Sequence, residues 1–356
     1  MVLAGVVVVA VIMFSLRGSA ARHTLVVASM PYWNFQHAAT AVLGHRDAVT
    51  EISPWIYGLS ASGQIDTQYP AGQTAAIAQD IHRLRAAGLL VVPTIANVTA
   101  GRWAYQPVGR MLHSAPLRAQ QVAAIVALVQ RRDYAGIDID YENLHASDRG
   151  AFSMFVADLA RALHAHGKVL SVAVFAKTSN AGTDPRNLAQ DYAAIGRAAD
   201  QVRLMGYDYH WATSAPGPVA PAGWIRAVLD YAKTQIPASK IVLGVPLYGY
   251  DWSAGHGTAI SWRQALRLAR QHHVAPRYDT ASQAPWFSYT AAGRRHTVWF
   301  ENAASSRAKF GLAHRAGIAG VYLWMYGDQD SGTWSALSQV LPTAGPHALS
   351  TSKAVP

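Results

Sequence analysis

The chain has 356 residues, of which 51% are hydrophobic and 14% charged, and this composition excludes a largely disordered protein. It contains no cysteine, which excludes disulfide bonds, thiolate metal sites and cysteine nucleophiles. The net charge of +10 would suit an anionic partner such as a cell-wall polymer, nucleic acid or lipid headgroups, but the charges are scattered. We therefore favour composition drift in an arginine-rich chain as its cause and predict no nucleic-acid partner.

The chain begins with an uninterrupted apolar run, from Met1 to Leu16. As a helix this run would span about 24 Å, which is short of a hydrocarbon core of roughly 30 Å. It fits the apolar region of a signal peptide better, and residues 18–21 supply small side chains for cleavage. Arg17 follows the run and no basic residue precedes it, which disfavours simple export, and a buried strand or core helix is an alternative. We predict a signal peptide or membrane anchor over residues 1–21 and an exported protein that is extracellular, wall-associated or anchored facing outside.

From His23 onward, short β-branched runs alternate with amphipathic stretches. The predicted strands are Thr24–Pro31, Val49–Tyr57, Leu89–Ala96, Gly136–Glu142, Val169–Phe175, Val202–Tyr209, Ile241–Tyr248 and Gly320–Met325. The predicted helices are Gln73–Ala87, Leu117–Arg132, Ser147–His166 with Ser147 and Asp148 as its cap, Leu188–Ala199 and Trp224–Gln235. Eight strands joined through helices predict an α/β fold, a (β/α)8 TIM barrel. A doubly wound open sheet is disfavoured because no glycine-rich phosphate loop follows the first strand.

The connection between the last two predicted strands is too long for a loop. It contains a predicted helix, three β-like pieces and a hairpin turn, at Ser261–His273, Ala275–Asp279, Pro285–Thr290, Arg295–Glu301 and Ala291–Arg294. We predict a small α+β insertion at about 251–316 within a barrel domain of residues 22–345, followed by a disordered tail at 346–356. Its tryptophans would line a saccharide groove or fill the core of the insertion; they are Trp252, Trp286 and Trp299.

Three acids stand two residues apart on the fourth predicted strand: Asp138, Asp140 and Glu142. Alternate residues of a strand share a face, so the three carboxyl groups point the same way, roughly 6–7 Å apart. A solvated edge strand is one alternative, but Ile137 and Ile139 indicate an interior parallel strand. A metal site is the other, and it is disfavoured because no histidine or further acid lies at ligand spacing. The pattern favours acid–base chemistry and no metal.

The position of these acids on a barrel strand predicts how deep in the barrel each of them lies. Catalytic side chains of such barrels gather at the carboxyl ends of the strands, which places Glu142 at the rim, Asp140 below it and Asp138 deepest. Carboxylates this close cannot all ionise cheaply, so at least one should be protonated near neutral pH. A protonated acid beside an ionised partner is what glycoside hydrolysis requires.

The segment Gly136–Glu142 resembles the strand-four signature of family 18 glycoside hydrolases, which include chitinases and endo-β-N-acetylglucosaminidases. Further segments resemble the family's strands six, seven and eight: Met205–Asp208, Gly244–Gly249 and Gly320–Trp324. Other segments resemble the branch that degrades spore cortex or peptidoglycan: Val298–Asn302, Pro216–Pro221 and Tyr141–Asn143. The chain departs from the chitinase pattern at two places, Ala135 and Pro93–Asn97. The departure at Pro93–Asn97 puts chitin as the natural substrate in doubt.

The resemblance implies a substrate-assisted mechanism, an exception to the two-carboxylate scheme. Glu142 would protonate the glycosidic oxygen while the acetamido oxygen of the substrate attacks the anomeric carbon. Asp140 would orient the acetamido group, Asp138 would tune Asp140 through a shared proton, and Tyr207 would hydrogen-bond the acetamido oxygen. The remaining implied roles are in substrate binding, with Trp324 as an apolar floor and Met205, Asp208 and Tyr32 around the sugar.

From these features we predict a monomeric, cofactor-free retaining hydrolase of β-linked N-acetylglucosaminyl polymers, acting on peptidoglycan, spore cortex or chitin-like substrates. A non-catalytic carbohydrate-binding protein on the same barrel is the alternative, and the acid at Glu142 favours the enzyme. A structural coat or wall-anchoring protein would leave the acid triplet unexplained.

Overall fold

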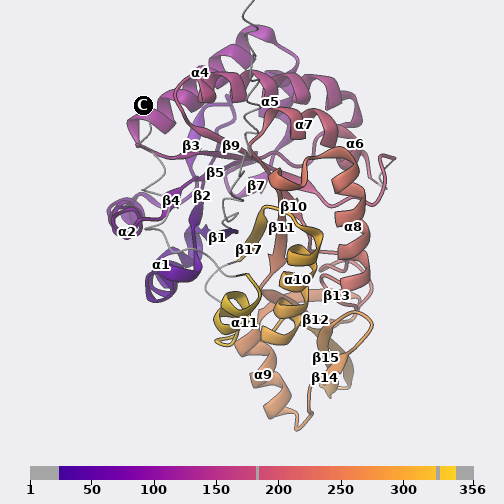
Figure 1. Cartoon of the computed structure of the whole chain (residues 1–356). Coiled ribbons are helices and arrows are strands. Elements are labelled where there is room, and N and C mark those ends of the chain that lie inside the picture. Colours follow the sequence, from indigo (N-terminus) through magenta and orange to yellow (C-terminus); the bar gives the residue numbers. More distant parts are fainter. Residues whose placement is uncertain (1–23, 182–183, 326–328, 342–356) are drawn as a thin grey trace, which may run out of the picture.

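A computed structural model describes residues 24–181, 184–325 and 329–341 of the chain (Figure 1). The predicted signal peptide or anchor at 1–21 and the predicted disordered tail at 346–356 lie outside these residues. Within the described ranges, no helix is both long and apolar enough to cross a membrane.

Among the described residues, eight parallel strands close into a barrel (Figure 1). Strand β1 pairs with both β2 and β17, and this double pairing closes the ring. The predicted TIM barrel is confirmed. In ring order the strands are β1 (Leu25–Pro31), β2 (Glu51–Leu59), β5 (Thr94–Ala96), β8 (Gly136–Asp140), β9 (Val169–Phe175), β10 (Gln201–Met205), β11 (Ile241–Pro246) and β17 (Gly320–Trp324).

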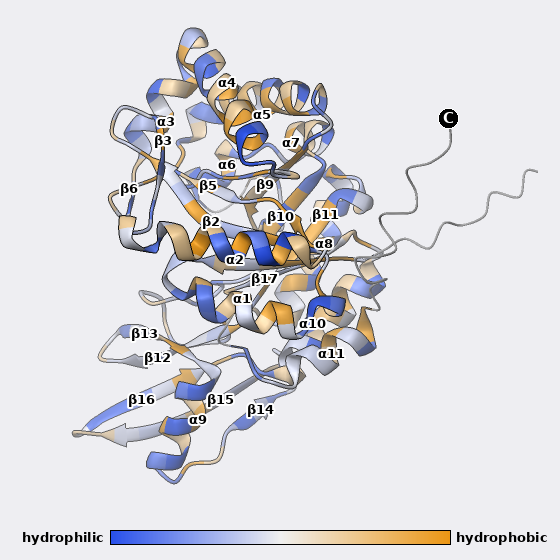
Figure 2. Cartoon of the chain, turned by 90° about the vertical axis from the view of Figure 1, so that its left-hand side faces the viewer, coloured by the Kyte–Doolittle hydropathy of each residue, from blue (hydrophilic) through white to orange (hydrophobic). Residues whose placement is uncertain are grey.

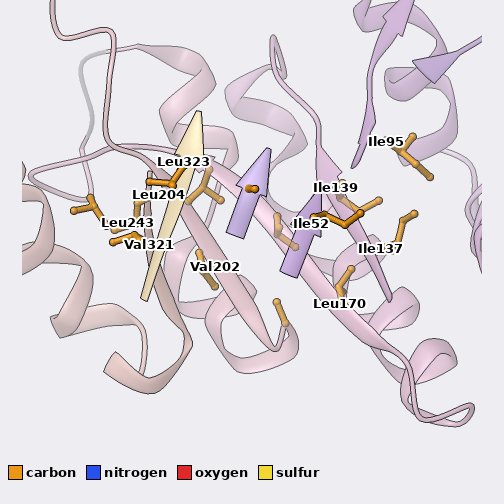
Figure 3. Close-up of a cluster of buried hydrophobic side chains, with 14 of the residues drawn as sticks. Ile52, Ile95, Ile137, Ile139, Leu170, Val202, Leu204, Leu243, Val321 and Leu323 are labelled. Atoms are coloured by element: carbon orange, nitrogen blue, oxygen red, sulfur yellow. The ribbon is translucent and has the colours of Figure 1, made fainter. Parts of the chain in front are cut away.

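Helices cover the outside of the barrel, and the main apolar core lies between them and the strands. Alternate strand residues such as Ile137, Ile139 and Leu204 point outward into this core, as Figure 3 shows. Their neighbours along the strands point into the barrel, where the functional residues lie. The covering helices are α1 (Phe35–Gly44), α2 (Thr74–Ala86), α3 (Tyr105–Leu112), α4 (Ala115–Arg131), α5 (Arg149–His164), α6 (Pro185–Ala189), α7 (Tyr192–Ala198), α8 (Ala222–Gln235), α10 (Ala303–Ala316) and α11 (Thr333–Val340).

The insertion between β11 and β17 forms a lobe beside the barrel (Figure 2). The lobe consists of β12 (Tyr248–Ser253), β13 (His256–Ser261), α9 (Trp262–Gln271), β14 (Arg277–Asp279), β15 (Ala284–Ala291) and β16 (Arg294–Trp299). Its antiparallel sheet has the order β13-β12-β16-β15-β14. Helix α9 packs on this sheet, with its Ala265 and Ala269 in one apolar cluster with Phe287 and Val298 of the strands. Helix α10 packs on α8, β11 and β17 of the barrel, so the lobe ends near residue 299 rather than 316.

Several predicted strands end earlier than the pattern indicated. Strand β8 ends at Asp140, so the prediction that the strand extends to Glu142 was wrong. Strand β10 ends at Met205 rather than Tyr209, because the chain leaves the sheet and Asp208 has a positive φ of 56°. Strand β11 ends at Pro246, and Tyr248 already belongs to β12.

Two other predicted elements are interrupted. The strand predicted at 89–96 is divided into β4 (Leu90–Val91) and β5, because Pro93 has no N–H for the ladder. The helix predicted at 188–199 is two helices, and the Asp191 side chain caps the second by accepting a hydrogen bond from the Ala194 N–H at 3.0 Å. Short hairpin strands that the pattern missed are β3 (Ile65–Thr67), β6 (Val98–Thr99) and β7 (Arg102–Trp103).

The start of α5 also differs from the predicted Ser147–Asp148 cap. A short 3-10 turn at Ala146–Asp148 precedes the helix, and the Asp148 carboxylate accepts a hydrogen bond from the His145 N–H at 2.7 Å. Asp148 therefore closes the turn before α5, and Ser147 does not cap the helix.

Candidate active site

The lower interior of the barrel is polar and centred on Arg203, which is fully buried. One arm of its guanidinium lies 2.6 Å from a carboxylate oxygen of Glu51, and the other lies 3.3 Å from Oδ2 of Asp138. The Thr94 hydroxyl also donates to Oδ2 of Asp138, at 2.9 Å. Asp138 is therefore held by a buried cation and a hydroxyl, which explains how an interior strand carries this acid.

Asp140 lies two residues further along β8, opposite Ala96 of β5. The indole N–H of Trp55 donates to Oδ2 of Asp140 at 3.1 Å. Burial and the nearby charge of Asp138 raise the pKa of Asp140, while the Trp55 hydrogen bond and Arg203 oppose the increase. Asp140 is consequently poised to take up a proton in a pH range where an ordinary aspartate is ionised.

Glu142 lies two residues beyond the end of β8 and is half-buried. Burial, followed by the charges of Asp140 and Asp208, raises the pKa of Glu142 well above its ordinary value, and Arg186 opposes the increase. Asn97 holds the backbone of Glu142 through both its N–H and its carbonyl oxygen. A carboxyl group in this state can carry a proton at a pH where an ordinary glutamate is ionised and can deliver that proton to a ligand.

Asp140 and Glu142 face a cavity of about 280 Å³ at the carboxyl ends of the strands. Six of the residues predicted for the site line this cavity, while Asp138 lies beneath it and Asp208 beside it. The complete lining consists of Tyr32, Trp33, Trp55, Val98, Gly101, Trp103, Asp140, Glu142, Ala173, Met205, Tyr207, Tyr322 and Trp324. The cavity thus combines two carboxyl groups with a mainly aromatic wall, a combination that suits a sugar ring.

Trp324, at the end of β17, forms the centre of the aromatic wall. Its ring lies 6.3 Å from those of Tyr207 and Tyr322, with interplanar angles of 15° and 24°. Burial raises the pKa of Tyr207 well above its ordinary value, so its hydroxyl stays protonated and can donate a hydrogen bond.

Asp208 contacts β12, the first strand of the insertion. Its Oδ1 accepts hydrogen bonds from the hydroxyls of Tyr248 at 2.6 Å and Tyr250 at 3.2 Å, and burial raises its pKa. Asp208 thus lies close enough to Glu142 to affect its pKa and is not among the residues that line the cavity, and its part in substrate binding stays a prediction.

Sequence reasoning missed several residues that shape the site. Trp55, Trp33 and Trp103 line the cavity, and Asn97 and Arg203 hold its acids in place. Their partners lie far away in the sequence, so no local pattern identifies them. Among the described residues, no group of three or more histidine or acidic side chains is placed to hold a metal ion.

Residues 78–330 match the model of the glycosyl hydrolases family 18. The chain belongs to this family. The family and the enzyme class predicted from the sequence are thereby confirmed. The family match covers the carboxyl-end residues Asp140, Glu142, Tyr207 and Trp324.

Known proteins with similar sequences or structures include both wall-lytic enzymes and chitinases. A cortical fragment-lytic enzyme of Bacillus subtilis (strain 168) is 37% identical over 235 residues, which are 64% of this chain and 54% of the relative. A chitinase from Chromobacterium violaceum ATCC 12472 has a TM-score of 0.83 and 33% identity, covering 90% of this chain and 99% of its own. The Bacillus cereus spore cortex-lytic enzyme SleL has a TM-score of 0.81 and 28% identity, covering 91% of this chain and 76% of its own. The chain spans 54% to 65% of the length of the first curated relatives it matches.

Proposed function

We propose that the protein is a retaining hydrolase of β-linked N-acetylglucosaminyl polymers, with bacterial peptidoglycan or spore cortex as its substrate class. The observation that carries this proposal is the pair of carboxyl groups with raised pKa, Asp140 and Glu142, beside an aromatic cavity wall. The cortex-lytic proteins among its relatives support the choice of polymer. A cavity of about 280 Å³ is at the small end for ligand sites, which suits one sugar unit at the reacting centre.

In the first step, Glu142 gives its proton to the glycosidic oxygen as the bond to the anomeric carbon breaks. The acetamido oxygen of the same sugar attacks the anomeric carbon, and an oxazolinium ion forms. The carboxylate of Asp140 accepts a hydrogen bond from the acetamido N–H and stabilises the developing positive charge. Tyr207 donates its hydroxyl proton in a hydrogen bond to the acetamido oxygen, and Trp324 supports the apolar face of the sugar.

In the second step, the carboxylate of Glu142 takes a proton from water, and the water oxygen attacks the anomeric carbon. The oxazolinium ring opens and regenerates the acetamido group. Two displacements on one carbon give net retention of configuration. The aromatic wall limits access of other water molecules to the intermediate.

The test compares the full chain with Glu142→Gln on peptidoglycan, spore cortex fragments and chitin oligosaccharides. The wild type should release new reducing ends, and the variant should lose on the order of 10²–10⁴ in rate, the usual contribution of a general acid. Asp230→Asn, at an exposed position on α8, is the control and should keep full activity. Proton NMR of the first product should show the β anomer.

Binding without release of reducing ends by the wild type would instead identify a carbohydrate-binding protein. Activity that survives in Glu142→Gln would refute the assignment of the proton donor. An α anomer as the first product would refute the retaining mechanism.

We also propose that the protein acts outside the cytoplasm, because residues 1–16 form an uninterrupted apolar run followed by small residues. Fusion of residues 1–30 to a reporter that is active only after export tests this. An inactive, cytoplasmic fusion would refute the proposal.

A further inference from the structure

We propose that Asn97 is a positioning residue that fixes the backbone of Glu142 and thereby aims its carboxyl group into the cavity. This inference rests on the proposed function of Glu142 as the proton donor. Asn97 directly follows β5 and is fully buried. It lies in Pro93–Asn97, one of the two places where the sequence departs from the chitinase pattern.

The side chain of Asn97 contacts both polar groups of the Glu142 backbone. Its Oδ1 accepts a hydrogen bond from the Glu142 N–H at 2.8 Å, and its Nδ2 donates to the Glu142 carbonyl oxygen at 2.7 Å. A carboxamide carries the same donor and acceptor as a peptide group. The side chain therefore pairs with Glu142 as a neighbouring strand would, although β8 has already ended at Asp140.

The chain turns immediately after Glu142, because Asn143 has a positive φ of 52°. Glu142 thus stands between the end of a strand and a tight turn, where the regular ladder no longer holds its backbone. The two hydrogen bonds from Asn97 replace that ladder. The backbone they fix decides how the carboxyl group meets the charged groups around it, which are Asp140, Asp208 and Arg186.

Asn97 also connects Glu142 to the hairpin formed by β6 and β7. Nδ2 donates a longer hydrogen bond to the Ala104 carbonyl oxygen at 3.3 Å, and the Ala104 N–H donates to the Asn97 carbonyl oxygen at 2.8 Å. Ala104 directly follows Trp103, whose ring lines the cavity 6.4 Å from that of Trp55. The Asn97 side chain therefore contacts both the backbone of Glu142 and the hairpin that carries Trp103.

The test uses Asn97→Ala in the full chain, with Ile125→Val as a control for lost stability. Ile125 is fully buried on α4 and does not line the cavity, and its substitution by valine removes one buried methyl group and so lowers stability modestly. For Asn97→Ala we expect kcat per folded molecule to fall on the order of 100-fold, the effect of displacing a catalytic group by about 1 Å. KM should change little, because the backbone hydrogen bond from the Ala104 N–H to the Asn97 carbonyl oxygen remains and still holds the hairpin that carries Trp103.

The pH profile separates positioning from a merely structural role. In Asn97→Ala the backbone of Glu142 is no longer fixed, and its carboxyl group becomes more exposed to solvent. Its pKa should therefore fall, and the alkaline limb of the kcat profile should move to lower pH. Ile125→Val should lose stability with an unchanged profile. An alkaline limb and a kcat per folded molecule that stay at wild-type values in Asn97→Ala would overturn the proposal.

A second variant and a second measurement keep the inference testable. Asn97→Asp keeps the shape of the side chain and replaces its donor with an oxygen, but it also adds a carboxyl group beside Glu142, so this variant is assayed by kcat and KM and not by the pH profile. If Asn97→Ala does not fold, Asn97→Asp should show the same loss of kcat with little change in KM, and a wild-type kcat would refute the positioning role. Carbon-13 NMR of the Glu142 carboxyl group, assigned with Glu142→Gln, follows its titration without substrate. If the wild type hydrolyses no polymer, the proposed function fails, while an identical Glu142 titration in the wild type and in Asn97→Ala would refute the positioning role.

Discussion

Trp55→Phe should displace the acid limb of the activity profile to higher pH. The indole N–H of Trp55 donates to Oδ2 of Asp140 at 3.1 Å, and a hydrogen bond to the charged form favours that form. Phenylalanine fills much of the same space and has no donor. The pKa of Asp140, already raised by burial and by Asp138, should therefore rise further.

The size of this displacement follows from the strength of the lost bond. A hydrogen bond to a charged group contributes about 1.5–3 kcal/mol, and one pKa unit corresponds to about 1.36 kcal/mol. The pKa of Asp140 should consequently rise by about one to two units. The proposed mechanism needs the carboxylate of Asp140 to accept from the acetamido N–H, so activity should be lost at a pH where the wild type is still active.

The assay is kcat/KM measured against pH, which reports the ionisations of the free enzyme. Trp103→Phe is the matched control, because Trp103 also lines the cavity and contacts the Trp55 ring but makes no hydrogen bond to Asp140. It should change KM and leave the acid limb in place. An acid limb that does not move in Trp55→Phe, or that moves equally in both variants, would refute the reasoning.

Two further substitutions test the charges around the site. Asp208→Asn removes a negative charge that raises the pKa of Glu142, so the alkaline limb of kcat/KM should move to lower pH; an unchanged limb would argue against this coupling. Arg203→Met leaves Glu51 and Asp138 buried without their cation and should lower the free energy of unfolding by about 3–5 kcal/mol at pH 7 in urea titrations. Burial raises the pKa of Glu51, so Glu51 can take up a proton as the pH falls, and the loss should be smaller at pH 4; equal losses at both pH values would contradict this account.

The barrel and the inward direction of its acids could be predicted because both depend on local periodicity. Ile137 and Ile139 alternate with Asp138 and Asp140, and a period of two places the two pairs on opposite faces. The ends of the strands could not be predicted as well. At Glu142 the side-chain amide of Asn97, which directly follows β5, makes the hydrogen bonds to the backbone that a neighbouring strand would otherwise make.

The residues that hydrogen-bond the acids of the site could not be predicted, for a related reason. Trp55 reaches Asp140 across 85 positions of sequence, and Asn97 reaches Glu142 across 45. These contacts exist because β5 pairs with both β2 and β8, which brings the three strands side by side in the sheet. In the sequence, a lone tryptophan in a hydrophobic strand indicates packing. That its indole N–H donates a hydrogen bond to Asp140 becomes visible only when the strands are assembled in the sheet.

The surroundings of Arg203 explain why the pKa values of the two acids above it are raised although a cation lies nearby. A single buried guanidinium beneath Asp140 would hold that carboxyl group ionised, because an opposite charge favours the charged form. Arg203 instead faces both Glu51 and Asp138, so its charge is already matched by two carboxylates. The charge of Asp138 then raises the pKa of Asp140, and the charge of Asp140 raises that of Glu142. Asp138, the deepest acid of the triplet, thus offsets the charge of Arg203 and at the same time raises the pKa of Asp140.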